Sequence, residues 1–64
     1  MEDYQQRVVD EKSELDKRLE TLTKFLAGEV SATIDAEECV RLEKQQSLMA
    51  QYSAILQERI DNFS

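Results

Sequence analysis

The 64-residue sequence contains no proline, no histidine and no tryptophan, and it has one glycine and one cysteine. Without proline, and with Gly28 as the only helix-breaking residue, the chain can form long helices. A single cysteine, Cys39, excludes an intrachain disulfide and is typical of an intracellular protein. The lack of histidine removes the commonest metal ligand and the usual near-neutral general base. Self-association is therefore the route to stability that the composition leaves open to so short a chain.

Long hydrophobic runs are also missing. No apolar stretch approaches the roughly 20 residues of a membrane-spanning helix, and no signal-peptide core follows Met1. The net charge of −6 comes from 14 acidic and 8 basic residues. Tight binding to DNA or RNA requires clustered lysine and arginine, so this acidic balance disfavours it. We expect a soluble protein that binds neither a membrane nor DNA or RNA, although a few converging basic side chains can still bind a small anion.

The residues that are present form two blocks with helical spacing. In the first, from about residue 2 to residue 27, apolar side chains recur in alternating steps of three and four. Gln5 and Lys12 occupy the same stripe, where leucine would be expected. In the second block, from about residue 36 to residue 63, the apolar side chains form two adjacent seven-residue rows. One row holds Leu48 and Ile55, and the other holds Met49, Leu56 and Phe63.

The segment between the blocks, residues 28–35, is predicted to be a loop. Gly28 is suited to the left-handed conformation that closes many helices. Asp35 is a good N-cap, and Glu38 is placed to complete a capping box. Ile34 and Cys39 occupy the positions of a hydrophobic staple, which favours a packing role for Cys39 over a reactive thiol. Acidic and basic residues four apart, such as Glu20 with Lys24 and Glu37 with Arg41, are predicted to pair on the helix surfaces.

These patterns predict a single all-α domain over residues 1–64, an antiparallel two-helix hairpin. Two helices share only one face, so one of the two rows of the second helix can pack inside the hairpin and the other is left exposed. We therefore expect the hairpin to assemble into an oligomeric helical bundle. A continuous helix through Gly28 is the alternative, which the capping signals disfavour.

The sequence contains no catalytic motif: no glycine-rich phosphate loop, no CxxC and no HExxH. The predicted protein is not an enzyme and uses no cofactor or metal. Antiparallel pairing would bring basic and aromatic side chains together near the open end of the hairpin. The residues expected to bind a ligand by stacking on a base or contacting a phosphate are Tyr4, Arg7, Lys12, Tyr52 and Arg59. The alternative is structural, with Arg7 and Arg59 lying along apolar surface and pairing with carboxylates.

Two segments carry a family resemblance: YQQRVVDEKSELDKRLETLTKF, residues 4–25, and LEKQQSLMAQYSAILQERIDNF, residues 42–63. They resemble the two helices of a family of very short proteins from tailed phages and prophages, related to an uncharacterised protein of a crAss-like phage. Between them, Val30 or Ile34 stands where that family would have an aromatic residue. In size and helical content the chain is also distantly similar to phage anti-CBASS sponges, oligomers that sequester cyclic oligonucleotide immune signals without cleaving them.

Two functions follow as hypotheses. By the resemblance, the chain would be an anti-defence sponge in the cytoplasm of a bacterial host, a homo-oligomer that holds a cyclic di- or trinucleotide. Tyr4 and Tyr52 would stack on bases, while Arg7, Lys12 and Arg59 would neutralise phosphates. Alternatively, the exposed apolar row would bind another protein, which would make the chain an adaptor or an inhibitor of a host protein. A minor virion or assembly component is a third possibility.

Overall fold

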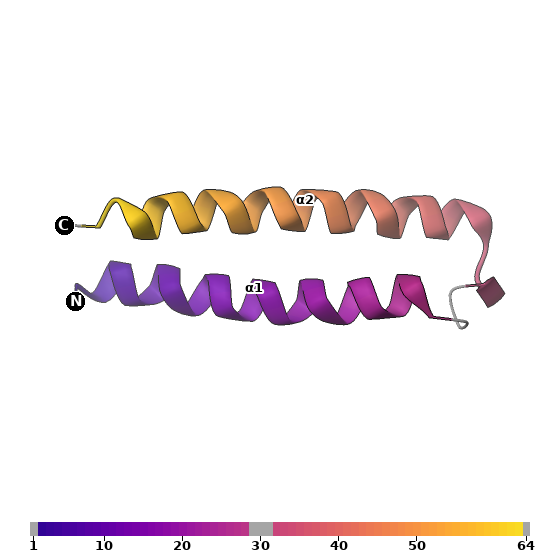
Figure 1. The fold of residues 1–64 in the computed structure, drawn as a ribbon, viewed down its shortest axis with the longest axis horizontal. Helices are drawn as coiled ribbons and strands as arrows, with labels where there is room; N and C mark the ends of the chain where they lie inside the picture. The colour runs from indigo at the N-terminus through magenta and orange to yellow at the C-terminus, as the bar shows by residue number, and fades with distance from the viewer. Residues whose placement is uncertain (1, 29–31, 64) are drawn as a thin grey trace.

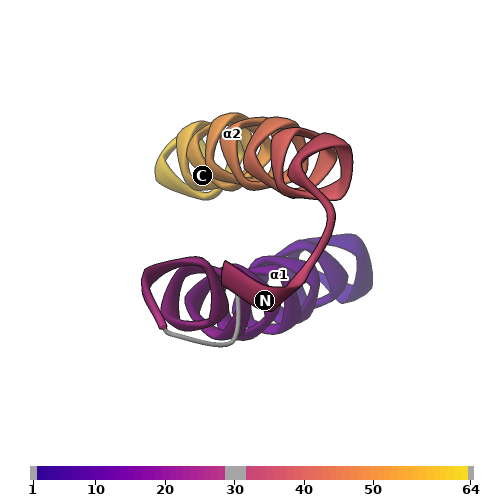
Figure 2. The same cartoon turned by 90° about the vertical axis from the view of Figure 1, so that its right-hand side faces the viewer.

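The computed structural model describes residues 2–28 and 32–63, and it contains two long helices. Helix α1 spans Asp3–Ala27 and helix α2 spans Ala36–Asp61. They lie side by side and antiparallel, with the chain ends together at one end of a rod of 46 × 14 × 14 Å (Figure 1). The end-on view shows the two helices as a single pair, and the described residues add no further helix or strand that covers either side (Figure 2). The predicted helical hairpin is confirmed.

The Gln5 side chain caps the N-terminus of helix α1. Its side-chain Oε1 accepts a hydrogen bond of 3.0 Å from the backbone N–H of Glu2, and its Nε2 donates to the Tyr4 hydroxyl at 3.4 Å. Gln5 is buried, so these bonds offset the cost of removing its amide from water. The polar residue at a position where leucine would be expected therefore caps the helix.

The predicted conformation of Gly28 is wrong. Its φ of −90° and ψ of 167° are extended rather than left-handed. The backbone N–H of Gly28 donates to the Phe25 carbonyl at 3.1 Å, a short closing turn from which the chain leaves in an extended direction. This ending needs no positive φ, so the special freedom of glycine is not used here. Val30, one of the two positions considered for a missing aromatic, lies outside the described residues.

Helix α2 starts where the sequence predicts. The Asp35 side chain accepts a hydrogen bond from the Glu37 backbone N–H at 3.4 Å, which makes Asp35 the N-cap. The Glu38 carboxylate accepts a hydrogen bond of 2.8 Å from Arg41 Nε, so the predicted Glu37–Arg41 pair is replaced by a pair one residue closer. The pair of Glu20 with Lys24 is confirmed at 3.0 Å. At its other end α2 stops at Asp61, two residues before the predicted limit, with Asn62 as the C-cap.

The helices meet along a seam with strict heptad spacing. On α1 the seam residues are 5, 8, 12, 15, 19, 22 and 26. On α2 they are 39, 42, 46, 49, 53, 56 and 60, followed by residue 63 just after the helix ends; all are buried or half-buried. Leu56 is fully buried and Val8 nearly so. Of the two rows predicted on α2, the one containing Met49 and Leu56 lies in this seam, and the one containing Leu48 and Ile55 lies outside it. The predicted division of α2 into two rows is therefore confirmed.

Two hydrogen bonds between polar residues fix the register of the seam. Gln46 Nε2 donates to Thr23 Oγ1 at 2.9 Å, and the Ser53 hydroxyl donates to Asp16 Oδ1. Both bonds join residues whose numbers sum to 69, so a shift of one turn would break both. The register also sets which residues lie at the same height: residue 57 of α2 lies level with Lys12, about one and a half turns from Tyr52.

Candidate functional site on one side of the hairpin

Helix α2 carries a second stripe of residues beside the seam, which we call the outer row. Each member directly precedes a seam residue: Arg41, Gln45, Leu48, Tyr52, Ile55 and Arg59. The three central side chains are large and uncovered, with exposed fractions of 65% for Leu48, 44% for Tyr52 and 52% for Ile55. Apolar surface of this kind, concentrated on one stripe, is typical of a binding surface.

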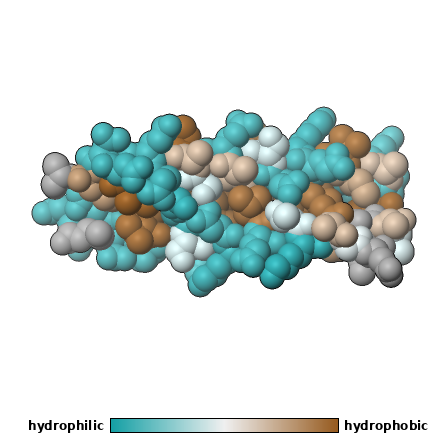
Figure 3. Space-filling view, in the orientation of Figure 1, coloured by the Kyte–Doolittle hydropathy of each residue, from teal (hydrophilic) through white to brown (hydrophobic). Residues whose placement is uncertain are grey.

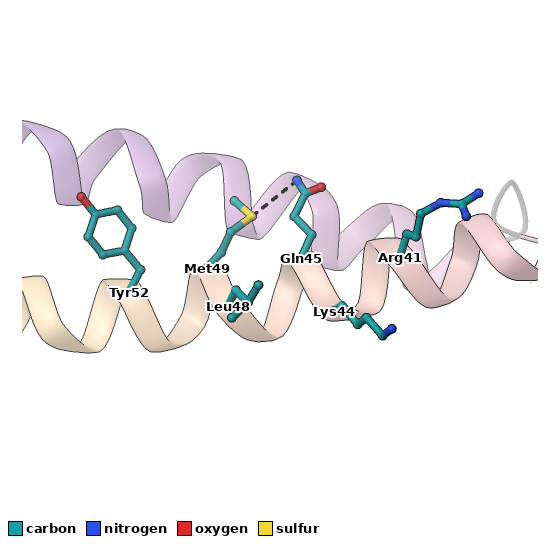
Figure 4. A pocket seen from close by; sticks show the side chains of 6 residues that line it. All are labelled: Arg41, Lys44, Gln45, Leu48, Met49 and Tyr52. Atoms are coloured by element: carbon teal, nitrogen blue, oxygen red, sulfur yellow. Dashed lines mark hydrogen bonds between the residues drawn. The ribbon is translucent and has the colours of Figure 1, made fainter.

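A shallow groove of about 450 Å³ lies along the outer row. Its lining residues are Arg41, Lys44, Gln45, Leu48, Met49 and Tyr52. All six come from α2, with the basic residues at one end and Tyr52 at the other (Figure 4). The side chains of one helix can form only one wall of a site, so a ligand here would remain half exposed unless another surface covered it.

The side of α1 that flanks this groove follows from the pairing. In an antiparallel pair, the positions that directly precede the seam residues lie on the same side of both helices. On α1 these positions include Tyr4, Arg7 and Arg18. Together with the outer row they form what we call the shared face. Viewed with both helices in the plane, the apolar surface of the hairpin forms a broken band between hydrophilic borders (Figure 3).

The five residues predicted to bind a ligand are not all brought together. Tyr4, Arg7, Tyr52 and Arg59 lie on the shared face, whereas Lys12 lies in the seam. Lys12 Nζ is 2.6 Å from Asp16 Oδ2, and only 21% of its side chain is exposed. The register places Lys12 level with residue 57 rather than with Tyr52. A lysine held by a carboxylate in the seam is poorly placed to neutralise a phosphate.

Tyr4 and Arg59 lie at the open end of the hairpin. The Tyr4 ring packs edge-on against the Phe63 ring, with 5.9 Å between centroids and an interplanar angle of 80°. Arg59 lies in the last turn of α2, four residues before Phe63, and Arg7 is one turn after Tyr4 on α1. Tyr4, Arg7 and Arg59 therefore lie within about one turn of this aromatic contact. Tyr52 lies two turns further along α2, toward the groove.

The cations of the chain divide into two groups. Four are in ion pairs: Lys12 with Asp16, Lys17 with Glu14, Lys24 with Glu20 and Arg41 with Glu38. Within the described residues the other four, Arg7, Arg18, Lys44 and Arg59, make no ion pair. Three of these belong to the shared face, and the fourth, Lys44, lines the groove beside it. In a chain of net charge −6, the four cations without an ion pair among the described residues are therefore gathered on one side.

Sequence reasoning missed Arg41 and Lys44 as parts of this side. The signal was present, because both precede Leu48 at helical spacing, Arg41 on the outer row and Lys44 beside it. Arg41 was interpreted as half of a surface ion pair, which it is, with Glu38. Of the acidic residues on the same side, Glu11 and Glu14 belong to α1, and Glu38 belongs to α2, where it pairs with Arg41.

One ionisable group is clearly perturbed, and it belongs to the seam rather than to the shared face. The pKa of Asp16 is lowered by the hydrogen bond from Lys12 and then by the one from Ser53, while desolvation acts weakly in the opposite direction.

Among the described residues, no group of three or more metal-binding side chains is close enough to hold an ion. No helix of the described chain is long and apolar enough to cross a membrane.

Comparison with known protein families adds a name to this geometry. The family model called Sequestin matches residues 2–62, which covers both helices and the loop between them. The chain belongs to the Sequestin family. No curated protein and no solved structure gives a significant match. The match spans α1 and α2 together.

Proposed function

We propose that this Sequestin-family protein sequesters a cyclic oligonucleotide immune signal by binding it on the shared face, without cleaving it. The name of the family indicates sequestration. The observation that carries the proposal is the gathering of all four unpaired cations of the described chain beside two exposed tyrosines. Arginine and lysine bind phosphates, and tyrosine rings stack on bases, so the side combines both kinds of contact that a nucleotide requires.

The proposal assigns a role to each group. Tyr52, with Leu48 beside it, offers a flat and partly apolar platform for a base. Arg59 and Lys44 supply charge for phosphates on either side of that platform, and Tyr4 with Arg7 extends the site at the open end. A non-enzymatic role fits a face that offers phosphate and base contacts, since binding alone removes a signal from solution. The setting proposed is the cytoplasm of a bacterium infected by a phage that encodes the protein.

Titration calorimetry with a panel of cyclic di- and trinucleotides tests this function. The expected result is heat of binding with at least one member, followed by recovery of that ligand chemically intact after the protein is denatured. Cyclic ligands that give no heat at protein concentrations of tens of micromolar would contradict the proposal. Recovery of a linear or shortened nucleotide would contradict its non-enzymatic part.

A second function is favoured by the apolar centre of the outer row. Leu48 and Ile55 are more than half exposed and lie two turns apart on one stripe, as in helices that dock into a hydrophobic groove. The chain would then be an adaptor or an inhibitor of a host protein. Capture from bacterial lysate separates the two functions, because an adaptor should retain a stoichiometric protein and a sponge should retain none.

A further inference from the structure

We propose that two copies of the chain pair their outer rows antiparallel about a two-fold axis, and that each end of this interface joins Lys44 of one copy to Arg59 of the other in an anion site that one chain lacks. The proposal rests on the proposed function for the identity of the ligand but not for the pairing itself. It follows from the pattern of the outer row and from the charges beside it.

The outer row is suited to pairing with itself. From Arg41 to Arg59 it reads basic, polar, apolar, apolar, apolar, basic, in the same alternating steps of four and three that the seam uses. A two-fold interface requires one stripe to match its own reverse. Pairing positions whose numbers sum to 100 places Leu48 against Tyr52 of the partner twice at the centre, and Ile55 against Gln45 on either side. This register also overlaps the two α2 helices over nearly their full length.

The small apolar core of a single hairpin is a reason for such pairing. Apart from Leu56 and Val8, no apolar side chain in the described chain is fully enclosed. A domain of this size supplies little net stability from its own core. Covering Leu48, Tyr52 and Ile55 with the same residues of a second copy would bury the largest exposed apolar side chains of α2.

The two ends of the interface gain positive charge. In the same register Arg59 of the partner faces Arg41, beside Lys44. Arg41 is already bound to Glu38, so the surplus at each end consists of Lys44 and the Arg59 of the other copy. Like charges brought together repel unless an anion lies between them. A phosphate group at each end would remove that repulsion, so a phosphate-bearing ligand should strengthen the dimer.

The register can be measured with spin labels placed outside the interface, at exposed residues Glu43 and Gln57. In a Cys39→Ala background, Glu43→Cys and Gln57→Cys give two singly labelled proteins. Pairing about the level of residue 50 separates each label from its copy by about 21 Å along the helix axis, from a rise of about 1.5 Å per residue. The two distances should therefore be similar. If the distance measured at residue 43 differed from that measured at residue 57 by about 20 Å, the helices would be shifted by one heptad, and the register would be overturned.

Sedimentation equilibrium tests the interface and the anion site together. Leu48→Glu should weaken self-association by roughly a hundredfold or more, because it places two charges at the centre of the interface. The matched control is Val40→Glu, which alters an exposed apolar residue of the same helix whose side chain points about 100° away from the outer row. It should self-associate like the original chain. Equal effects of the two substitutions would overturn the interface.

The same measurement is repeated with inorganic pyrophosphate at constant ionic strength. Pyrophosphate should increase the dimer fraction of the original chain and leave that of Arg59→Gln unchanged. If it acts on neither protein, or equally on both, the anion site is wrong. A chain that binds a cyclic oligonucleotide as a monomer would overturn this inference and leave the proposed function standing. A dimer with the expected register that binds no cyclic oligonucleotide would do the reverse.

Discussion

The carboxylate of Asp16 on α1 joins Lys12 of its own helix to Ser53 of α2. One oxygen is 2.6 Å from Lys12 Nζ, and the other accepts the hydrogen bond of the Ser53 hydroxyl. This small polar group links the two helices across the seam, beside Leu15. It sets the register at the cost of apolar burial. The two helices are therefore aligned by polar contacts and held together by a modest apolar core.

Stability should depend on the ionisation of Asp16. Because the hydrogen bonds from Lys12 and Ser53 lower its pKa in the folded chain, their contribution is present above the unfolded value and is lost as pH falls through the folded one. We expect the melting temperature to drop on acidification below about pH 4, near the ordinary pKa of aspartate. Asp16→Asn should lower the melting temperature at neutral pH and reduce this acid-dependent drop. Circular dichroism melts from pH 2 to pH 7 measure both.

The control for this prediction is Asp10→Asn. Asp10 accepts a hydrogen bond from Gln6 of its own helix and contacts no residue of α2 that fixes the register. Its substitution should leave the shape of the pH profile as it is in the original chain. An Asp16→Asn profile that runs parallel to the original would contradict a role for Asp16 in acid sensitivity.

Leu56→Ala should be the most damaging single truncation in α2. Its side chain is fully buried in the seam, and replacing such a leucine by alanine costs about 2–5 kcal/mol. That is a large share of the stability available to a domain this small. We expect the variant to be largely unfolded at 25 °C, so that circular dichroism shows no cooperative melt on heating. Val40→Ala, at an exposed position of the same helix, should shift the melting temperature by only a few degrees.

Gly28→Ala should stabilise the hairpin. The extended φ and ψ of Gly28 suit any residue, and a Cβ there would be 3.4 Å from the Lys24 carbonyl oxygen and 3.6 Å from that of Phe25, both ordinary contacts. Alanine restricts the unfolded chain more than glycine does, which is worth about 0.4–1 kcal/mol at a compatible position. Urea denaturation should show a higher midpoint with the same slope. A lower midpoint would indicate that Gly28 is left-handed in solution.

Ligand binding should depend on Arg59 and not on Lys12. Arg59 lies exposed on the shared face without an ion-pair partner among the described residues, while Lys12 is held in the seam by Asp16. Arg59→Gln should weaken binding of a cyclic oligonucleotide by roughly tenfold or more, the usual value of a charge-assisted contact to phosphate. Lys12→Gln should lower the melting temperature and leave the calorimetric affinity unchanged. The opposite pattern would place the ligand in the seam.

Most of the fold could be predicted from the sequence because heptad spacing and the Asp35 cap are local signals. The spacing identified both rows of α2, and the lack of proline left both helices uninterrupted. The conformation of Gly28 could not be predicted, since a glycine after a helix is compatible with either ending. The role of Gln5 was also hidden, because a capping contact to Glu2 depends on where the helix begins.

The candidate site was predicted in part. Tyr4, Arg7, Tyr52 and Arg59 lie on one side of the hairpin, and helical spacing alone fixes the direction of each of these side chains. Lys12 was misplaced because the register depends on contacts between helices, chiefly Asp16 with Ser53, that no local pattern reveals. Arg41 and Lys44 were overlooked for a related reason: charged residues on a helix surface are usually solvated, and only the groove along the outer row distinguishes these two.

The most direct test of the account is the mass of the chain in solution, measured by light scattering over a dilution series at micromolar concentrations. If a second surface must cover Leu48, Tyr52 and Ile55, the mass should be a multiple of 7.4 kDa. Where dilution lowers the mass, the melting temperature should fall with it. A mass of 7.4 kDa at every concentration, with an unchanged cooperative melt, would contradict it.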